Sequence, residues 1–142
     1  MARKKIRECT AKGLLKRHHK LLPNNFGAVQ AVAETDWVAL AEAHPWLKTE
    51  KLVVKPDMLF GQRGKHDLVG LKLTLEEAEA FVKARVGRII TVENHASHTA
   101  VTDAVTHFII ERFVPHEEEF YLSIQSMREY TCIHLSHKGG IY

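Results

Sequence analysis

The stretch Leu52-Val-Val-Lys-Pro-Asp57 decides the fold that we predict, together with the loop Phe60-Gly-Gln-Arg-Gly-Lys65 and the run Leu68–Leu73 that follow it. Residues 52–54 are apolar, as in a buried strand, and Pro56 ends that strand directly after Lys55. The loop is basic and contains two glycines, and the apolar run behind it indicates a return strand. The sequence therefore predicts a strand, a basic loop and a second strand.

Residue types alone leave two interpretations of this unit open. A lysine at the end of a buried strand, facing a flexible basic loop, suits a polyphosphate. Lys55 would act as a point charge, the loop arginine can bind in a fork, and the glycines let backbone N–H groups approach closely. In the other interpretation, Lys55 is a surface lysine and the loop is an ordinary hairpin.

The composition is that of one soluble globular domain. The chain has 142 residues, of which 45% are hydrophobic and 26% charged. No apolar run approaches the length of about 18 residues that a membrane span needs, so no membrane partner is expected. Two cysteines, Cys9 and Cys132, are too few for a disulfide framework, so we expect both to be reduced thiols. A single disulfide between these two distant residues is the alternative.

Positive charge is concentrated at the start of the chain. Residues 1–20 contain eight lysines and arginines but one acidic residue, Glu8, so this segment carries +7 and the remainder −4. A basic first segment can be a transit peptide, a nucleic-acid arm or a solvated helix face. It lacks serine and interleaved aromatic residues, so a solvated helix face is favoured and no nucleic-acid partner is expected.

Two helices have clear start signals. Thr10 can cap a helix that runs to about Leu22, and Thr74-Leu-Glu-Glu77 has the pattern of a capping box. The helix behind the capping box is predicted to reach about Val86, with Gly87 closing it. A shorter helix is predicted over residues 37–43. The apolar face of the first helix would hold Leu14, Leu15, His18, Leu21 and Leu22.

The other apolar runs predict strands. The chain has no internal repeat and no low-complexity linker, so a single domain is expected. Strands mixed with helices, and apparent hairpins, indicate the α+β class with mixed or antiparallel strands and flanking helices. These further strands are predicted over residues 26–33, 88–93, 106–114, 120–126 and 130–136, with 94–104 as a polar loop.

Histidine is abundant, but its spacing does not indicate a metal site. The pairs His95/His98 and His134/His137 have no third ligand beside them, and loop or surface histidines are favoured. Cys132 and His134 would share a strand face, yet no acidic residue is evident to orient the histidine as a base. No catalytic or metal-binding residue is therefore predicted. The glycine-rich phosphate motifs of P-loop and Rossmann proteins are also absent from the sequence.

The acidic run Glu117–Glu119 directly follows a predicted buried strand. It is either a solvated turn or a site at which one glutamate holds the hydroxyls of a ribose. Carboxylates suit ribose because they accept both hydroxyl protons.

Several separated motifs, in order along the chain, resemble ATP-citrate lyase. The opening octet and Met58-Leu-Phe-Gly61 resemble the plant-type alpha chain, whose first part is an ATP-grasp domain like that of succinyl-CoA synthetase. The motifs are residues 1–8, Pro45-Trp-Leu47, Leu52–Gly61, Arg63-Gly-Lys65, Leu68-Val69, Phe113-Val-Pro-His116 and Glu118-Glu-Phe-Tyr-Leu122.

The resemblance implies an ATP site. Lys55 would contact the ATP phosphates, and Arg63 and Gly64 would belong to the loop that closes over them. Glu111, Arg112 and Val114 would belong to the hinge that holds adenine, and Glu119 would hold the ribose. The family usually has Glu-Pro-Phe-Val-Pro-His at this hinge, and Arg112 stands here in place of the proline.

The resemblance also implies the reaction. Together with the partner subunit of the hetero-oligomer, the family's enzyme converts citrate, CoA and ATP to acetyl-CoA, oxaloacetate, ADP and phosphate in the cytosol. Its Mg²⁺ ligands and citrate-binding module would lie beyond residue 142. We therefore expect a fragment that is inactive alone, with a partial ATP-grasp fold divided into a helical N-terminus, 1–47, and a nucleotide-binding subdomain, 48–142.

Two other functions stay open at this stage. The first is a non-catalytic interaction module, which would dock into the hetero-oligomer through the basic helix at 10–22 and the strands at the end of the chain. The second is a protein similar to the beta subunit of succinyl-CoA synthetase. The sequence motifs at 45–47 and 113–116 argue against that second alternative.

Overall fold

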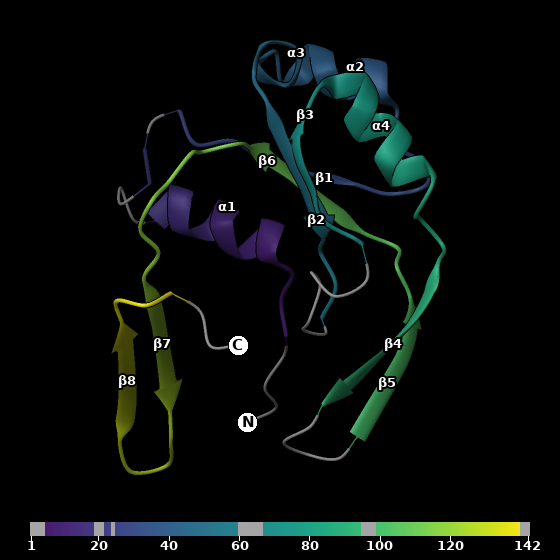
Figure 1. Cartoon of the computed structure of the whole chain (residues 1–142). Coiled ribbons are helices and arrows are strands. Elements are labelled where there is room, and N and C mark those ends of the chain that lie inside the picture. Colours follow the sequence, from purple (N-terminus) through teal and green to yellow (C-terminus); the bar gives the residue numbers. More distant parts are fainter. Residues whose placement is uncertain (1–4, 19–21, 24, 60–66, 95–98, 140–142) are drawn as a thin grey trace.

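A four-stranded antiparallel sheet forms the centre of the computed structural model, which describes residues 5–18, 22–23, 25–59, 67–94 and 99–139 (Figure 1). Its strands lie in the order β1 (Ala28–Ala31), β6 (Phe108–Arg112), β2 (Leu52–Pro56) and β3 (Gly70–Leu73). The predicted strand and return strand are confirmed as β2 and β3, which pair directly, while the predicted loop at 60–65 lies outside the described residues. Segment 1–47, expected to be helical, also contributes β1 to this sheet.

Two hairpins project from the sheet (Figure 1). One consists of β4 (Ile89–Asn94) and β5 (Thr99–Ala104), and the other of β7 (Tyr121–Ser126) and β8 (Thr131–Ser136). The prediction of a polar loop over residues 94–104 is therefore wrong for 94 and 99–104. Threonine and valine in β5 are β-branched and suit a strand, although their polarity resembled a loop. A hydrogen bond of 2.8 Å joins the hydroxyls of Thr91 and Thr102 across the pair.

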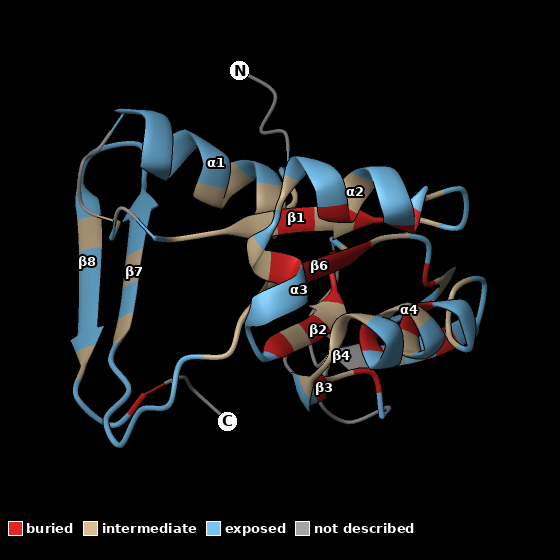
Figure 2. Cartoon of the chain, turned by 90° about the horizontal axis from the view of Figure 1, so that it is seen from above, coloured by how far each residue is buried: buried red, intermediate tan, exposed pale blue. Residues whose placement is uncertain are grey.

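Among the described residues, four helices accompany the strands: α1 (Glu8–His18), α2 (Trp37–Ala43), α3 (Trp46–Thr49) and α4 (Leu75–Lys83). Figures 1 and 2 show α1 and α4 on opposite sides of the sheet. The bounds of α2 agree with the prediction, and α3 was not predicted. No helix in the described part of the chain is long and apolar enough to cross a membrane.

The apolar core lies between the sheet and α2, α3 and α4. In β2 the side chains alternate, so Leu52 and Val54 are buried while Val53 and Lys55 are partly exposed on the face toward α1. Phe108 in β6 is fully buried and meets the ring of Phe81 edge to face, with the ring centres 6.5 Å apart. Buried positions concentrate on β1, β2 and β6 (Figure 2).

The start of α1 differs from the prediction because its cap comes from a distant residue. The helix begins at Glu8, and the buried carboxylate of Asp57 accepts the backbone N–H groups of Glu8 (2.6 Å) and Cys9 (3.3 Å). The same carboxylate accepts the amide of Gln30 at 3.0 Å. Thr10 therefore is not the cap. An aspartate at this place satisfies helix N–H groups that otherwise lack partners.

The predicted apolar face of α1 is wrong where the structure describes it. Leu14 and Leu15 are 41% and 44% exposed, and no residue of α1 is buried. The helix is held to the sheet by polar contacts from its first two turns, so its later leucines stay accessible. Leu21 lies outside the described residues.

The capping box of α4 is confirmed and gives a measurable stability prediction. Thr74 accepts the Glu77 N–H, and the Glu77 carboxylate accepts the Thr74 N–H at 2.7 Å. Replacing Thr74 with alanine should cost about 1 kcal/mol of unfolding free energy in urea titrations, because α4 loses its cap. Thr10→Ala is the control, and no loss is expected there because Thr10 lies inside α1. An equal loss in both variants would contradict these assignments.

Candidate functional site

A pocket of about 310 Å³ lies where the chain leaves β6, beside the segment that precedes β1. Four of the residues that the sequence selected line it: Lys55, Glu111, Arg112 and Val114. They come together because Glu111 pairs with Val53 in the neighbouring strand, and Lys55 follows Val53 on the same face. The remaining lining residues are Pro23, Asn25, Phe26, Gly27, Val53 and His116.

The ammonium of Lys55 is bound by two carboxylates. Its Nζ lies 2.7 Å from Glu8 Oε1 and 2.9 Å from Glu111 Oε2. Lys12 in α1 contacts the same two glutamates, with its Nζ 2.7 Å from Glu8 Oε1. Two positive and two negative groups thus form a four-charge cluster, Glu8, Lys12, Lys55 and Glu111, whose formal charge is zero. The cluster ties α1 to β2 and β6.

Lys12 is charged in this cluster at neutral pH. Burial acts to lower the pKa of Lys12, but hydrogen bonds to Glu111 and Glu8 and the charges of both groups outweigh it. The pKa of Lys12 is therefore raised above its ordinary value. The side chains of Lys12 and Lys55 remain about one quarter exposed, at 27% and 24%. Solvent therefore screens part of the charge interactions in the cluster.

Glu119 stands at the rim of the pocket and reaches it through His116. The Oε1 atom of Glu119 lies 2.7 Å from Nε2 of His116, and Nδ1 of His116 lies 3.0 Å from the Val114 carbonyl oxygen. The hydrogen bond to that carbonyl and the one to Glu119 raise the pKa of His116. The structure therefore brings Glu119 near the other site residues, while its assignment to ribose stays a prediction.

Arg63 and Gly64, the predicted phosphate loop, lie outside the described residues. Within the described part of the chain, no group of three or more His, Cys, Asp or Glu side chains is placed to hold a metal ion. Cys132 and His134 do lie side by side on β8, with Sγ 3.1 Å from Nε2, and both cysteines are free.

Comparison with known proteins identifies the family. The family model of the ATP-citrate synthase ATP-grasp domain matches residues 2–142. The chain belongs to this family. The recognition of ATP-citrate lyase and the prediction of a partial ATP-grasp fold are both confirmed.

The relatives include plant alpha chains. ATP-citrate synthase alpha chain protein 3 of Arabidopsis thaliana is 49% identical over 99% of this chain and 32% of its own length. ATP-citrate synthase alpha chain protein 2 of Oryza sativa subsp. japonica is 47% identical over 99% of this chain and 33% of its own. The chain thus spans about one third of these plant relatives.

A solved structure extends the likeness to three dimensions. ATP citrate lyase from Methanothrix soehngenii, in complex with citrate and coenzyme A, is 38% identical, with a TM-score of 0.82 over 99% of this chain and 33% of that one. This agreement shows that the α+β arrangement around β1, β6, β2 and β3 belongs to the ATP-grasp region of ATP-citrate lyase.

Sequence reasoning missed several residues of this ATP-grasp site. Glu8 and Lys12 are four apart, a helical ion-pair spacing that was visible in the sequence. Their contact with Lys55 and Glu111 was not visible, because it joins the first helix to strands far along the chain. His116 was noted only as part of the Phe113-Val-Pro-His116 motif, and no local sequence signal placed it on the pocket wall.

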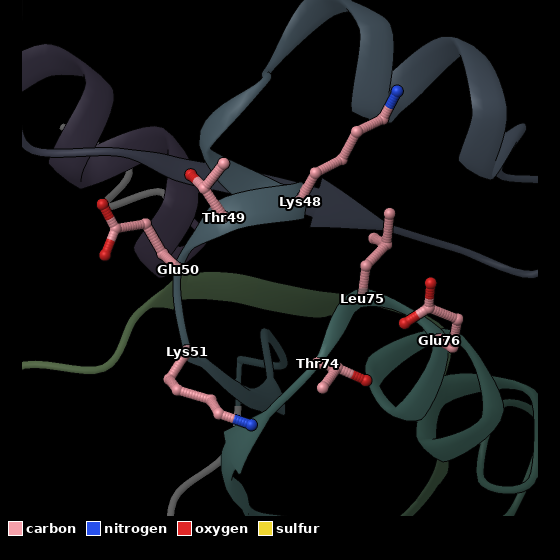
Figure 3. Close-up of a pocket in the computed structure, with 7 residues that line it drawn as sticks. All are labelled: Lys48, Thr49, Glu50, Lys51, Thr74, Leu75 and Glu76. Atoms are coloured by element: carbon pink, nitrogen blue, oxygen red, sulfur yellow. The ribbon is translucent and has the colours of Figure 1, made fainter.

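A second pocket of this ATP-grasp domain, of about 390 Å³, has no chemistry that points to a ligand (Figure 3). It lies between the end of α3 and the start of α4, and its lining contains two lysines and two glutamates. In Figure 3, Glu50 points away from Thr74 and Glu76, so the polar groups do not converge. The N-terminus of α4 is already satisfied by its capping box.

Proposed function

We propose that this chain supplies one wall of the ATP site of an ATP-citrate synthase. The observation that carries the proposal is the 310 Å³ pocket, which gathers Lys55, Glu111, Arg112 and Val114 in a domain of the ATP-grasp family. ATP is the nucleotide that an ATP-grasp domain uses. Pockets for such ligands are concave and largely apolar, with a few polar groups that fix orientation.

Each side of the pocket suits a different part of ATP. Val53, Phe26 and Val114 offer apolar contact to the adenine ring beside the backbone that leaves β6. Lys55 supplies a positive charge for the phosphates. Glu119 can accept the ribose hydroxyls, provided that its carboxylate gives up or shares the hydrogen bond with His116.

The four-charge cluster limits what Lys55 can do alone. The ammonium already faces two carboxylates, and ATP phosphates brought to it would also approach Glu8 and Glu111. Like charges at such distances repel, so part of the attraction to Lys55 is offset. The 142-residue chain is therefore expected to bind ATP weakly at most and to have no citrate cleavage activity.

The remaining parts of the reaction belong to the whole enzyme. In that enzyme, citrate and CoA are the other substrates, acetyl-CoA and oxaloacetate are the products, and the hetero-oligomer forms with a partner subunit in the cytosol. Phosphoryl transfer relies on metal-assisted charge stabilisation. We propose that the Mg²⁺ ligands come from other segments of the complete enzyme.

Titration with ATP tests this function. In NMR titrations, Lys55→Ala should weaken ATP binding about tenfold, because a charge-assisted contact of roughly 1.5–3 kcal/mol is lost and is partly screened here. Lys48→Ala removes an exposed lysine from the pocket shown in Figure 3 and is the matched control. Circular dichroism confirms that both variants fold.

Equal ATP affinities for wild type and Lys55→Ala would contradict the proposal. That outcome would favour the non-catalytic interaction module, which docks without using the nucleotide pocket. Cleavage of citrate by the purified chain would contradict the expected lack of turnover.

A further inference from the structure

A third cavity, of about 320 Å³, lies on the other side of the segment that precedes β1. This segment runs between α1 and α3, and Figure 2 shows it entering β1 there. The cavity wall combines Lys16 and Arg112 with Trp46, Phe26 and His44, and no carboxylate is among its described lining residues. Two positive charges without an acidic neighbour in the wall make the cavity attractive to anions.

Arg112 has unused hydrogen-bond donors at this cavity. Its Nε is buried and is without a hydrogen-bond partner among the described residues. Its Nη1 makes one long contact, 3.4 Å, to Glu50, whose side chain is 46% exposed and does not line the cavity. The guanidinium carbon lies 5.4 Å from the Trp46 ring centre.

Lys16 faces the same space from α1. Its Nζ donates to the carbonyl oxygen of Phe26 at 2.6 Å, and an ammonium has three N–H donors, so two remain for a ligand. Gly13, one turn earlier on the helix, has no side chain to fill the cavity, and a Cβ there would meet no atom within 4 Å. Lys16 can therefore reach an anion directly from the helix surface.

The aromatic wall is fixed by close packing. A Cβ on Gly27 would lie 2.7 Å from the Trp46 ring, so only glycine lets the backbone approach this closely. The imidazole of His44 packs against the other part of the Trp46 side chain, with the ring centres 6.5 Å apart. The Trp46 ring thus packs against Gly27 and His44, with the Arg112 guanidinium beside it.

We propose that this cavity is a second ligand site, specific for a small phosphate monoester with a ring or other apolar body. The phosphate would lie between Lys16 and Arg112, which offer charge-assisted hydrogen bonds, and the body would contact Trp46 and Phe26. The volume is that of a pocket for a small metabolite. This cavity shares Asn25, Phe26, Gly27 and Arg112 with the proposed ATP pocket. The two differ in their lysine, because Lys16 lines this cavity and Lys55 lines the ATP pocket.

Phenyl phosphate is the probe, and tryptophan fluorescence is the readout. Trp46 lines the cavity, and the other tryptophan, Trp37, is buried in the core. We expect a saturable change that Trp46→Phe abolishes. Lys16→Ala should weaken binding about tenfold or more, because one charged donor is lost. Lys55→Ala and Lys48→Ala should each leave the affinity for phenyl phosphate within about twofold.

ATP titrations of the same variants separate the two sites. Lys16→Ala should leave ATP binding within about twofold, the reverse of the result for phenyl phosphate. If Lys55→Ala weakened phenyl phosphate binding as much as Lys16→Ala does, the inference would be overturned, because the anion would then occupy the ATP pocket. Absence of a saturable change, or equal affinity for phenol, would also overturn it. Failure of ATP to bind would reject the proposed function and leave this site unaffected.

Discussion

Replacing Asp57 with alanine should lower the unfolding free energy by about 2–4 kcal/mol and loosen the start of α1. The Asp57 carboxylate is fully buried and accepts hydrogen bonds from Glu8, Cys9 and Gln30. Alanine would leave all three donors buried or partly buried without that acceptor. The first turn of α1 would also lose the negative charge that favours a helix N-terminus.

Two measurements separate loosening of α1 from general destabilisation. Urea titration gives the unfolding free energy, with Asp103→Ala as the matched control on an exposed aspartate, expected to change it by less than about 0.5 kcal/mol. Alkylation of Cys9 in a Cys132→Ser background then reports on α1. Burial and the Asp57 charge raise the pKa of the Cys9 thiol, so it reacts slowly in the wild type.

Alkylation of Cys9 should become faster in Asp57→Ala under conditions in which the protein is still folded, because α1 loosens and because the thiol loses the Asp57 charge that raises its pKa. Asp57→Asn retains one acceptor oxygen and should give an intermediate effect on both measurements. A loss of stability in Asp57→Ala as small as that in Asp103→Ala would show that Asp57 does not cap α1.

Replacing Glu111 with alanine should cost about 2–3 kcal/mol of unfolding free energy. Lys12 and Lys55 would then share Glu8 alone, and their two ammonium groups would repel each other. Removing one partner of a fully buried pair costs about 3–5 kcal/mol, but both lysines are about one quarter exposed, so solvent reduces the effect. Urea titration at neutral pH measures this cost.

A double variant provides the control for the four-charge cluster. Glu111→Leu combined with Lys12→Met retains the contact between Lys55 and Glu8 and leaves no extra charge. It should therefore be more stable than Glu111→Ala. If Glu111→Ala were as stable as the wild type, the cluster would contribute nothing to docking of α1.

The cluster also has a defined pH dependence. The pKa of Lys12 is raised above 10.5 in the folded state, so its contribution to stability is complete below that value. It is lost as the pH rises through the folded-state pKa. The stability difference between wild type and Lys12→Met should therefore shrink only in strongly alkaline solution, and a constant difference would argue against the shift.

Local signals predicted much of the fold. The capping box at Thr74–Glu77, the short helix at 37–43 and the strand at Leu52 each depend on neighbouring residues, and each is present. Lys55 was selected from its place at the end of a predicted strand and Val114 through a family resemblance, and the fold does bring them to one pocket. Their roles toward ATP remain proposals.

Features that depend on distant contacts could not be predicted. The cap of α1 comes from Asp57, far along the chain, so the helix starts before the local signal at Thr10. The partners of Lys55 include Glu8 in α1, a pairing that only the packed structure creates. The strand predicted over 88–93 is present as β4, but its partner β5 was missed for another reason, because threonine-rich strands have the polarity of loops.

The position of β6 between β1 and β2 has a consequence for how the chain folds during synthesis. Ala28 in β1 pairs with Glu111, which the ribosome adds more than 80 residues later. Until then β1 and β2 have no strand between them, and their apolar side chains stay exposed on the nascent chain. Pairings between residues so far apart in sequence fold slowly, since a long loop must close first. Chaperones would therefore meet this chain with its central strand missing, in the interval before residues 108–112 emerge from the ribosome.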